Sequence, residues 1–362
     1  MSTEASALNT FPELRATAGY IAGLQRPSGA IPWFSGGITD PWDHIEALMG
    51  LTVDGQWANA VAALQWLADH QRSDGAWYAA YNDCAVVDDS RAETNFVAYV
   101  ATGLWHYFLI TGQGDVLRKF WPMVNRAIEF VLSQQADSGE IYWAVDKHEG
   151  TSRDALVTGC SSIYKSLECA LNIGTELDEP RPAWRVARQQ LGNALRNHPE
   201  LFDRTWASKA RYSMDWFYPV LSGVITDEAA QTRLLNRWDT FVKKGFGCRC
   251  VADQPWVTVA ESCELVMACV AAGLPNHARQ VFDDIAQHQR ADGSWWTGYV
   301  FIEELYWPDE RPTWTAAAVL LAADALHDLT PGSKLFTSAA NTLEHPKSSA
   351  SPHGFEQSRG QR

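Results

Sequence analysis

The heptapeptide Gln71-Arg72-Ser73-Asp74-Gly75-Ala76-Trp77 decides the fold of this chain, because its pattern returns along the sequence. At four places a glutamine is followed by three residues, then a glycine and, shortly after, a tryptophan. These glutamines are Gln25, Gln71, Gln135 and Gln289. They lie 46, 64 and 154 residues apart, and 154 is three steps of about 51, so the pattern predicts six copies of a unit of roughly 50 residues. Two less regular copies are expected near residues 197–199 and 244–247.

Each unit is predicted to be a pair of helices joined by the glycine-containing turn and a loop. The first helices mix apolar and charged residues, as half-exposed helices do, and are expected over residues 11–25, 54–71, 116–135, 183–197, 228–243 and 276–289. The second helices are richer in small residues, which indicates packing on all sides, and are expected over residues 41–53, 90–111, 158–174, 213–225, 258–272 and 312–326. Twelve helices alternating between an outer and an inner layer predict an all-α fold, the (α/α)6 toroid of six helical hairpins.

The composition fits one large globular unit, with 362 residues, 46% of them hydrophobic, and 17 tryptophans. We expect the toroid domain over residues 9–330, a disordered N-terminus over 1–8 and a mostly disordered tail over 331–362. The net charge of −14 argues against a nucleic-acid partner, which would need a basic surface. The sequence predicts no integral membrane segment and no signal peptide, and its seven cysteines lack a C-x-x-C pair, so we expect reduced thiols and a cytoplasmic protein.

Acidic residues gather where the second helices are expected to begin. The most acidic stretch is Asp88-Asp89-Ser90-Arg91-Ala92-Glu93, in which Asp89 and Glu93 would share one helix face. Like charges this close raise the pKa of at least one carboxyl, which provides a proton donor at neutral pH. The helix starts of a toroid converge at one end, so acids from other starts are expected to face the same cavity. The candidate catalytic residues are Asp88, Asp89, Glu93, Asp215 and Glu261.

Aromatic side chains cluster in the same loops and helix starts. The candidate substrate-binding residues are Trp42, Asp43, His44, Trp216, Tyr218, Trp256, Trp307 and Trp314. Their rings would stabilise a carbocation through their π faces or stack against a sugar ring. Trp77, Trp143 and Trp295 belong to the repeat and are expected to be structural. No metal site and no cofactor are predicted, although a divalent metal is left open.

The Gln-x-x-x-Gly-x-Trp pattern at Gln71 and Gln289 resembles the QW motif of terpenoid cyclases and protein prenyltransferases. The run from Asp89 to Glu93 also resembles the Asp-Cys-Thr-Ala-Glu run of oxidosqualene cyclases, in which the Asp is the protonating acid. This resemblance implies that role for Asp89. The chain departs from the bacterial pattern Asp-x-Asp-Asp at Val86, is about half the length of a two-domain cyclase, and lacks the prenyltransferase zinc ligands in matching context.

A second resemblance is to six-hairpin glycosidases such as glucoamylase-like enzymes. It is carried by Leu109-Ile110-Thr111-Gly112-Gln113-Gly114-Asp115, Phe120-Trp121-Pro122 and Arg126-Ala127-Ile128-Glu129-Phe130. That chemistry needs two carboxyl groups in different protonation states across a sugar-binding mouth. The acids at inner-helix starts that could supply them are Asp40, Asp43, Glu46, Asp88, Asp89, Glu93, Asp215, Glu261 and Glu264.

Together these patterns favour an enzyme, with a prenyltransferase- or terpenoid-cyclase-like activity first. It would act by acid catalysis on an isoprenoid in a central aromatic-lined cavity. The alternative is a carbohydrate-active toroid enzyme, similar to glycoside hydrolases, that uses two carboxylates on a glycan. A non-catalytic binding toroid is the third possibility, since a shared fold does not give a shared reaction.

Overall fold

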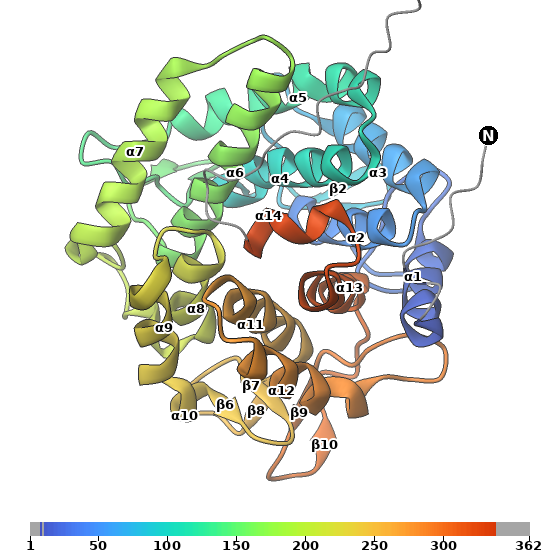
Figure 1. The fold of residues 1–362 in the computed structure, drawn as a ribbon. Coiled ribbons are helices and arrows are strands. Elements are labelled where there is room, and N and C mark those ends of the chain that lie inside the picture. The colour runs from blue at the N-terminus through green and yellow to red at the C-terminus, as the bar shows by residue number, and fades with distance from the viewer. Residues whose placement is uncertain (1–7, 9–10, 338–362) are drawn as a thin grey trace, which may run out of the picture.

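The structure is a computed structural model that describes residue 8 and residues 11–337. Six helices form the inner layer of the toroid. They are α2 (Pro41–Val53), α4 (Thr94–Thr111), α6 (Val157–Glu176), α8 (Ser213–Leu221), α11 (Val259–Ala271) and α13 (Thr313–His327). Each packs against the next in this order, and α13 packs back against α2, so the inner layer is a closed ring (Figure 1). The predicted (α/α)6 toroid is confirmed.

The outer layer carries one helix behind each inner helix. These are α1 (Pro12–Leu24), α3 (Trp57–His70), α5 (Gly114–Leu132), α7 (Pro182–Asn197), α9 (Asp227–Asn236) with the short α10 (Trp238–Phe241), and α12 (Pro275–Ile285). The chain runs once around the ring, so that α1 ends up beside α13 (Figure 1). One outer helix differs from its prediction. The single helix expected over 228–243 is divided into α9 and α10, because the backbone of Arg237 between them is not helical.

The repeated glutamine and glycine fasten each turn to the next outer helix. The side-chain amide of Gln71 donates to the carbonyl of Gly75 (2.8 Å) and to that of Met123 on α5 (2.9 Å). Gly75 has a left-handed φ of +96°, and a Cβ there would lie 2.2 Å from the carbonyl oxygen of Arg126. The repeat thus marks places where a turn must adopt positive φ and touch a neighbouring backbone, which only glycine allows.

The other three copies use the same contacts. Gln25 reaches α3, Gln135 reaches α7, and Gln289 closes the ring by reaching Thr17 on α1. The repeat tryptophans Trp77 and Trp295 are buried, and their indole N–H groups donate to Leu67 and Thr17. Their predicted structural role is confirmed.

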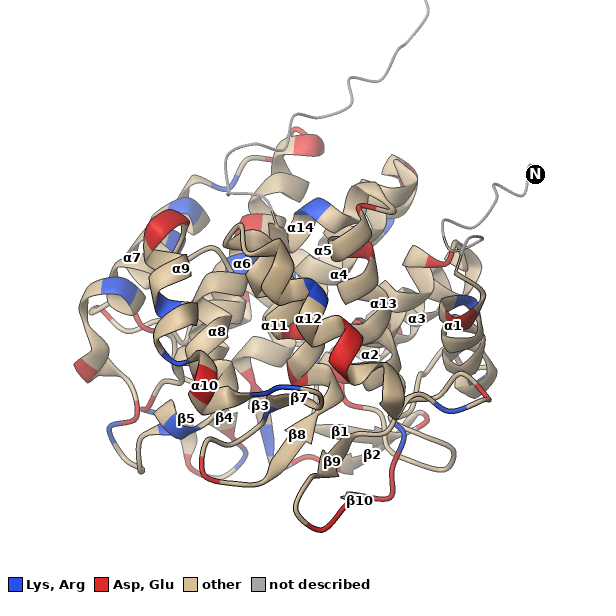
Figure 2. Ribbon diagram, turned by 60° about the horizontal axis from the view of Figure 1, so that its bottom comes forward, with Lys and Arg blue, Asp and Glu red and all other residues tan. Residues whose placement is uncertain are grey.

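The loops that lead into the inner helices contain short strands, which the sequence analysis did not predict. They are β1 (Ala80–Asn82), β2 (Ala85–Asp88), β3 (Arg91–Glu93), β4 (Ala144–Asp146), β5 (Gly150–Ser152), β6 (Val242–Lys243), β7 (Gly247–Arg249), β8 (Trp256–Thr258), β9 (Gly298–Val300) and β10 (Leu305–Tyr306). They form antiparallel sheets in the orders β1-β2, β3-β4-β5 and β10-β9-β8-β7-β6. All of them lie at one end of the toroid (Figure 2).

At this end, a ring of backbone hydrogen bonds links each loop to the next. In chain order they are Thr39 N to Tyr81 O, Thr94 N to Trp143 O, Asp203 N to Ala155 O, Ser213 N to Cys250 O, Val259 N to Thr297 O and Thr313 N to Trp33 O, with lengths from 2.6 to 3.1 Å. The last bond joins the final inner helix to the loop before the first. The six inner helices therefore begin around one common face, as predicted, and we call this face the site end.

The structure corrects the predicted start of one inner helix and part of the predicted tail. The inner helix expected from residue 90 begins at Thr94, because residues 91–93 form β3. Residues 331–337, predicted as part of the tail, form a 3-10 turn and the short α14 (Lys334–Thr337), and Leu335 is buried. The predicted disorder of 1–7 and 338–362 lies outside the described residues. None of the described helices is long and apolar enough to cross a membrane.

Candidate active site

The inner helices place chemically similar residues at matching depths below the site end. Their third residues, which we call the upper level, are Asp43, Phe96, Gly159, Asp215, Glu261 and Thr315. Their sixth residues, the lower level, are Glu46, Tyr99, Ser162, Tyr218, Glu264 and Ala318. In both levels α2 and α11 carry acids. The helix α13 stands between these two helices in the ring and carries the smaller residues Thr315 and Ala318 at the two levels.

Asp43 at the upper level has surroundings that favour the protonated form of its carboxyl group. It is partly exposed, and its side chain is hydrogen-bonded to that of Asp40, the N-cap residue of α2. Asp40 also accepts from the backbone N–H groups of Trp42 (2.9 Å) and Asp43 (3.0 Å), so the negative charge of the pair is stabilised on Asp40 and the proton on Asp43. Burial, together with the charges of Asp40, Glu46 and Glu264, raises the pKa of Asp43 well above its ordinary value.

Glu261, the matching residue on α11, has a different environment. Its carboxyl is partly exposed, and the Cys250 side chain is hydrogen-bonded to it. Its Oε2 atom is shielded from bulk solvent and has no hydrogen-bond partner among the described residues. A carboxylate oxygen with an unused lone pair is suited to accept a hydrogen bond from a water molecule or a substrate hydroxyl.

The lower level contains two buried Glu–Tyr pairs. The hydroxyl of Tyr99 donates to Glu46 (2.6 Å), and that of Tyr218 donates to Glu264 (2.9 Å). Burial raises the pKa of Glu46 to about 7, against the Tyr99 hydrogen bond. Burial and the charge of Glu46 raise the pKa of Glu264 well above its ordinary value. Sequence analysis noticed both glutamates only as acids at helix starts and missed Tyr99; the signal was the shared Asp/Glu-x-x-Glu spacing of α2 and α11.

Trp42 provides an aromatic surface beside these acids. Its ring stacks on Tyr99 with centroids 3.9 Å apart and lies 6.4 Å from the ring of Tyr218, which comes from across the barrel. It remains partly exposed. The structure thus places Trp42, Asp43, Tyr218 and Glu261 together, four of the residues that the sequence singled out.

Asp215 also belongs to the upper level. It is buried, accepts a hydrogen bond from the Thr158 hydroxyl (2.6 Å), and has its pKa raised by burial. Arg233 donates to the backbone carbonyl of Asp215 (2.8 Å). Asp215 therefore belongs to the predicted set of acids. It differs from Glu261 because its carboxyl group accepts a hydrogen bond from Thr158, whereas one carboxyl oxygen of Glu261 has no partner among the described residues.

Three of the predicted catalytic residues do not sit on the predicted helix. Asp88 ends β2, Asp89 lies in the following turn, and Glu93 ends β3. The Asp89 carboxylate pairs with Lys147, and its side chain is 49% exposed. The Ser90 side chain and backbone lower the pKa of Asp88. The hairpin therefore turns these two acids toward solvent, and Asp89 and Glu93 do not share a helix face as expected.

Glu93 is the one acid of that stretch near the cluster. It is half-buried and accepts from Arg91 (2.8 Å), while burial raises its pKa against the Arg91 charge and the negative charge of Asp40 adds to the rise. This ion pair makes it a supporting residue beside Asp40.

Two predicted substrate-binding residues point away from the site. His44 is fully buried between α2 and α3, where its ring nitrogens contact Ile31 N (3.1 Å) and Ala63 O (3.0 Å). Burial lowers its pKa to about 4. Trp216 is buried, stacks on Phe241, and donates to Arg233 O on the outer helix. Residue four of an α-helix points about 100° further round the helix axis than residue three, so His44 and Trp216 face the outer layer although Asp43 and Asp215 belong to the upper level.

The remaining aromatics lie at the edge of the site end. Trp314, the second residue of α13, is partly exposed, and its buried indole nitrogen has no hydrogen-bond partner among the described residues. Trp256 on β8 donates to the carbonyl of Trp307 (2.8 Å), and the two rings meet edge to face at 71°. Trp307 is 56% exposed. We call Trp256 and Trp307 the rim tryptophans.

No charged side chain neutralises the acids. Within residues 8 and 11–337, no Lys, Arg or His forms an ion pair with Asp40, Asp43, Glu46, Glu261 or Glu264. The same part of the chain contains no group of three or more His, Cys, Asp and Glu arranged to hold a metal ion. The cluster is thus stabilised by shared protons and by tyrosine and backbone donors.

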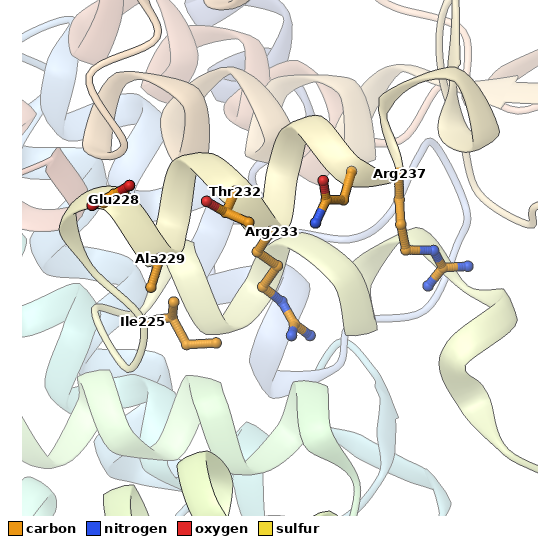
Figure 3. Close-up of a pocket in the computed structure, with 7 residues that line it drawn as sticks. Ile225, Glu228, Ala229, Thr232, Arg233 and Arg237 are labelled. Carbon is orange, nitrogen blue, oxygen red and sulfur yellow. The ribbon is translucent and has the colours of Figure 1, made fainter.

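A hollow of about 650 Å³ lies elsewhere, along the outer helix α9 (Figure 3). Its lining includes Glu228, Arg233 and Arg237. Both guanidinium groups already donate to backbone carbonyls, of Asp215 and Trp216 for Arg233 and of Ala210 for Arg237. The hollow lacks aromatic side chains and a second acid, so it does not compete with the site end.

No known family model matches the chain. A curated relative, the MMP endo-(1,4)-3-O-methyl-alpha-D-mannosidase of Mycolicibacterium hassiacum, is 48% identical over 324 residues, which cover 90% of this chain and 89% of the relative. Among solved structures, a wild-type glycosidase matches with a TM-score of 0.70 at 17% identity, over 91% of this chain and all of that chain. A D-mannose isomerase matches with a TM-score of 0.65 at 11% identity, over 91% and 99%. These structural likenesses show the fold alone.

The relative overturns the prenyltransferase- and terpenoid-cyclase-like function, and with it the isoprenoid substrate and the role of Asp89 as the protonating acid of a cyclase. The resemblance to six-hairpin glycosidases was the correct one. With nearly half of its residues shared over nine-tenths of both chains, the protein belongs to the family of this endo-mannosidase and is an enzyme of the glycosidase type.

Proposed function

We propose that the protein is an endo-acting glycoside hydrolase that cleaves (1,4)-linked chains of 3-O-methyl-α-D-mannose. The relative supports the linkage and the sugar. The observation that carries the chemistry is the unlike pair Asp43 and Glu261. One is a carboxylic acid held protonated beside Asp40, and the other has an unpaired carboxylate oxygen. Glycoside hydrolysis needs one carboxyl group that gives a proton and a second that accepts one or attacks the sugar, and we assign these roles to Asp43 and Glu261.

In the proposed reaction Asp43 is the general acid and Glu261 the general base. Asp43 gives its proton to the glycosidic oxygen as the bond to the anomeric carbon breaks, and Asp40 holds the acid in place through their hydrogen bond. Glu261 takes a proton from a water molecule, whose oxygen bonds to the anomeric carbon. One bond is cleaved and one water consumed, and solvent later returns the proton from Glu261 to Asp43.

The aromatic residues provide surfaces for a sugar chain. Trp42 and the rim tryptophans present exposed or partly exposed rings in the loops and helix starts of the site end. An apolar ring suits the C–H face of a pyranose and, even better, a methylated hydroxyl. An endo enzyme must hold sugars on both sides of the cleaved bond, and we assign Trp42 and the rim tryptophans to that task.

The test compares four variants on a 3-O-methylated (1,4)-mannan, with products separated by chain length. We expect Asp43→Asn and Glu261→Gln each to lower kcat by about 100- to 10,000-fold, the usual range for general acid–base catalysis. Both replacements keep shape, so melting temperatures should stay close to the parent. Asp89→Asn, at an exposed turn, should keep near-parental turnover.

Asp215→Asn distinguishes the two candidate bases. If Glu261 is the base, Asp215→Asn should retain measurable turnover while Glu261→Gln does not. Full activity of Glu261→Gln, or of Asp43→Asn, would refute the assignment of that residue. Absence of any cleavage of the methylated mannan by the parent would refute the proposed substrate.

A further inference from the structure

The second acids of α2 and α11 have no role in the proposed bond cleavage. Glu46 and Glu264 lie one helical turn below Asp43 and Glu261, where they are 5% and 8% exposed. A substrate would meet the upper level first. Each lower glutamate is nevertheless precisely placed by a tyrosine hydroxyl from a neighbouring inner helix, Tyr99 of α4 and Tyr218 of α8.

The groups that face Asp43 are all acidic or neutral. On its own helix they are Asp40 and Glu46, on α11 they are Glu261 and Glu264, on α4 and α8 they are Tyr99 and Tyr218, and Glu93 precedes α4 next to Asp40. The matching positions of α13 carry Thr315 and Ala318, which do not titrate. Arg91 pairs with Glu93, but in the described part of the chain no cation forms an ion pair with Asp40, Asp43, Glu46, Glu261 or Glu264.

We propose that Glu46 and Glu264 are positioning residues that keep the proton on Asp43, because a negative charge on either lower carboxyl group and a negative charge on Asp43 oppose each other. This inference rests on the proposed function, in which Asp43 is the acid. Carboxyl groups that interact this strongly lose their protons in separate steps, and each ionisation makes the next more costly. Because no cation pairs with Asp43, Glu46 or Glu264 in the described part of the chain, the repulsion between their negative charges is not relieved. Asp43 therefore keeps its proton over a wider pH range. The hydroxyls of Tyr99 and Tyr218 hold the two lower carboxyl groups in place through hydrogen bonds.

The experiment follows the titration of the Asp43 carboxyl by carbon-13 NMR of the full chain, without substrate, in Glu46→Gln and Glu264→Gln. Each change removes one ionisable neighbour, so Asp43 should titrate lower by about 1 pH unit or more. The alkaline limb of the pH–rate profile should move in the same direction. Glu264→Asp keeps the charge and should restore the parental titration of Asp43, which a purely structural role for Glu264 would not predict.

The matched control is Asp324→Asn, which removes another buried carboxyl, near the opposite end of α13. Burial raises the pKa of Asp324 to about 6, but its partner is Thr330. The titration of Asp43 should not change in this variant. If a glutamine variant does not fold, Tyr99→Phe and Tyr218→Phe replace it and should shift Asp43 in the same direction by a smaller amount.

An unchanged titration of Asp43 in both glutamine variants would overturn the inference, even with an active hydrolase. Conversely, the titration needs no substrate, so it still tests the carboxyl coupling if the proposed activity proves wrong. The two proposals therefore fail in distinguishable ways.

Discussion

Glu46 combines a buried carboxyl, a tyrosine partner and a raised pKa, and it should make the stability of the protein depend on pH. The unfolded chain loses this proton near the ordinary value of 4.5, whereas the folded chain holds it to about 7. Below pH 4.5 the contribution of Glu46 to folding is fully present, and it is lost as the pH rises through 7. One pKa unit corresponds to about 1.4 kcal/mol, so the loss is on the order of 3 kcal/mol.

We therefore predict that Glu46→Gln raises the melting temperature at pH 8 and changes it little at pH 5. Calorimetry at the two pH values measures the difference. Glu303→Gln removes a carboxyl from an exposed loop and serves as control, with no pH-dependent gain. A Glu46→Gln variant that is less stable than the parent at pH 8 would show that ionising the buried carboxyl group of Glu46 does not destabilise the folded protein.

At this scale the sequence predicted several site residues and misplaced others. Trp42, Asp43, Tyr218, Asp215 and Glu261 were all predicted, because acids and aromatics at helix starts of a toroid must converge. Asp89 was misjudged because an Asp/Ser-rich stretch is also typical of a helix N-terminus. Only the tertiary structure shows that residues 91–93 pair with β4 and that the helix begins after them.

Among the elements, the turn that contains Gly75 has the strictest requirement. Alanine there would need a left-handed φ and would place its Cβ 2.2 Å from the carbonyl oxygen of Arg126. Gly55 has a similar φ of +79° with nothing within 4 Å of a Cβ. We predict that Gly75→Ala destabilises the protein by about 3 kcal/mol or more, and Gly55→Ala by roughly 1 kcal/mol, the cost of the backbone conformation alone. Urea unfolding of both variants measures the difference, and equal losses would mean that the close approach to α5 is unimportant.

The hairpin of β9 and β10 carries the exposed Trp307 beside Trp256. If this rim holds distant sugars, Trp307→Ala should raise KM several-fold for a long methylated mannan and leave kcat nearly unchanged. The shortest cleavable oligomer should show a smaller change, because it does not reach the rim. Val186→Ala, at an exposed position on the outer helix α7, is the control. An equal rise in KM for long and short substrates would place Trp307 next to the cleaved bond instead.

The helices were predictable and the strands were not. Helical periodicity and the repeat extend over ten or more residues, so α2 was predicted with its observed ends. Each strand has only two to four residues, too few for a period-two pattern to be recognised. These strands nevertheless determine where the inner helices start, and so which acids reach the site.

In the whole molecule, the placement of the acid pair on next-but-one helices predicts the stereochemistry of the reaction. Packed helices are about 8–10 Å apart, so α2 and α11, with α13 between them in the ring, have axes roughly 15 Å apart. Side chains reaching inward from both then leave room for a water molecule between the carboxyl groups, the spacing typical of inverting enzymes. We predict that proton NMR of the fresh product shows the β-anomer. An α-anomer as first product would require a closer pair of carboxyl groups and would refute the assignment of Asp43 and Glu261 as an inverting pair.

The wrong function came from the most conspicuous pattern in the sequence. The Gln-x-x-x-Gly-x-Trp repeat marks how turns clamp onto outer helices, and any enzyme built on this toroid can use it. The side chains of Gln71 and Trp77 donate to backbone carbonyls and not to the acids of the site. The chemistry lies in isolated acids such as Asp43 and Glu261, whose meaning depends on which residues surround them in the folded chain.

The ring of loop-to-loop hydrogen bonds also affects how the protein is made. Its closing bond joins Thr313 to Trp33, two residues that leave the ribosome 280 positions apart. At roughly 5–20 residues per second, the first hairpin waits for tens of seconds before its partner is synthesised. During that time Asp43 has no α11 to face, and the α1 surface that receives Gln289 and Trp295 stays uncovered. A nascent chain of this protein therefore has neither the paired acids nor a sealed core, and both arise together when the last hairpin docks.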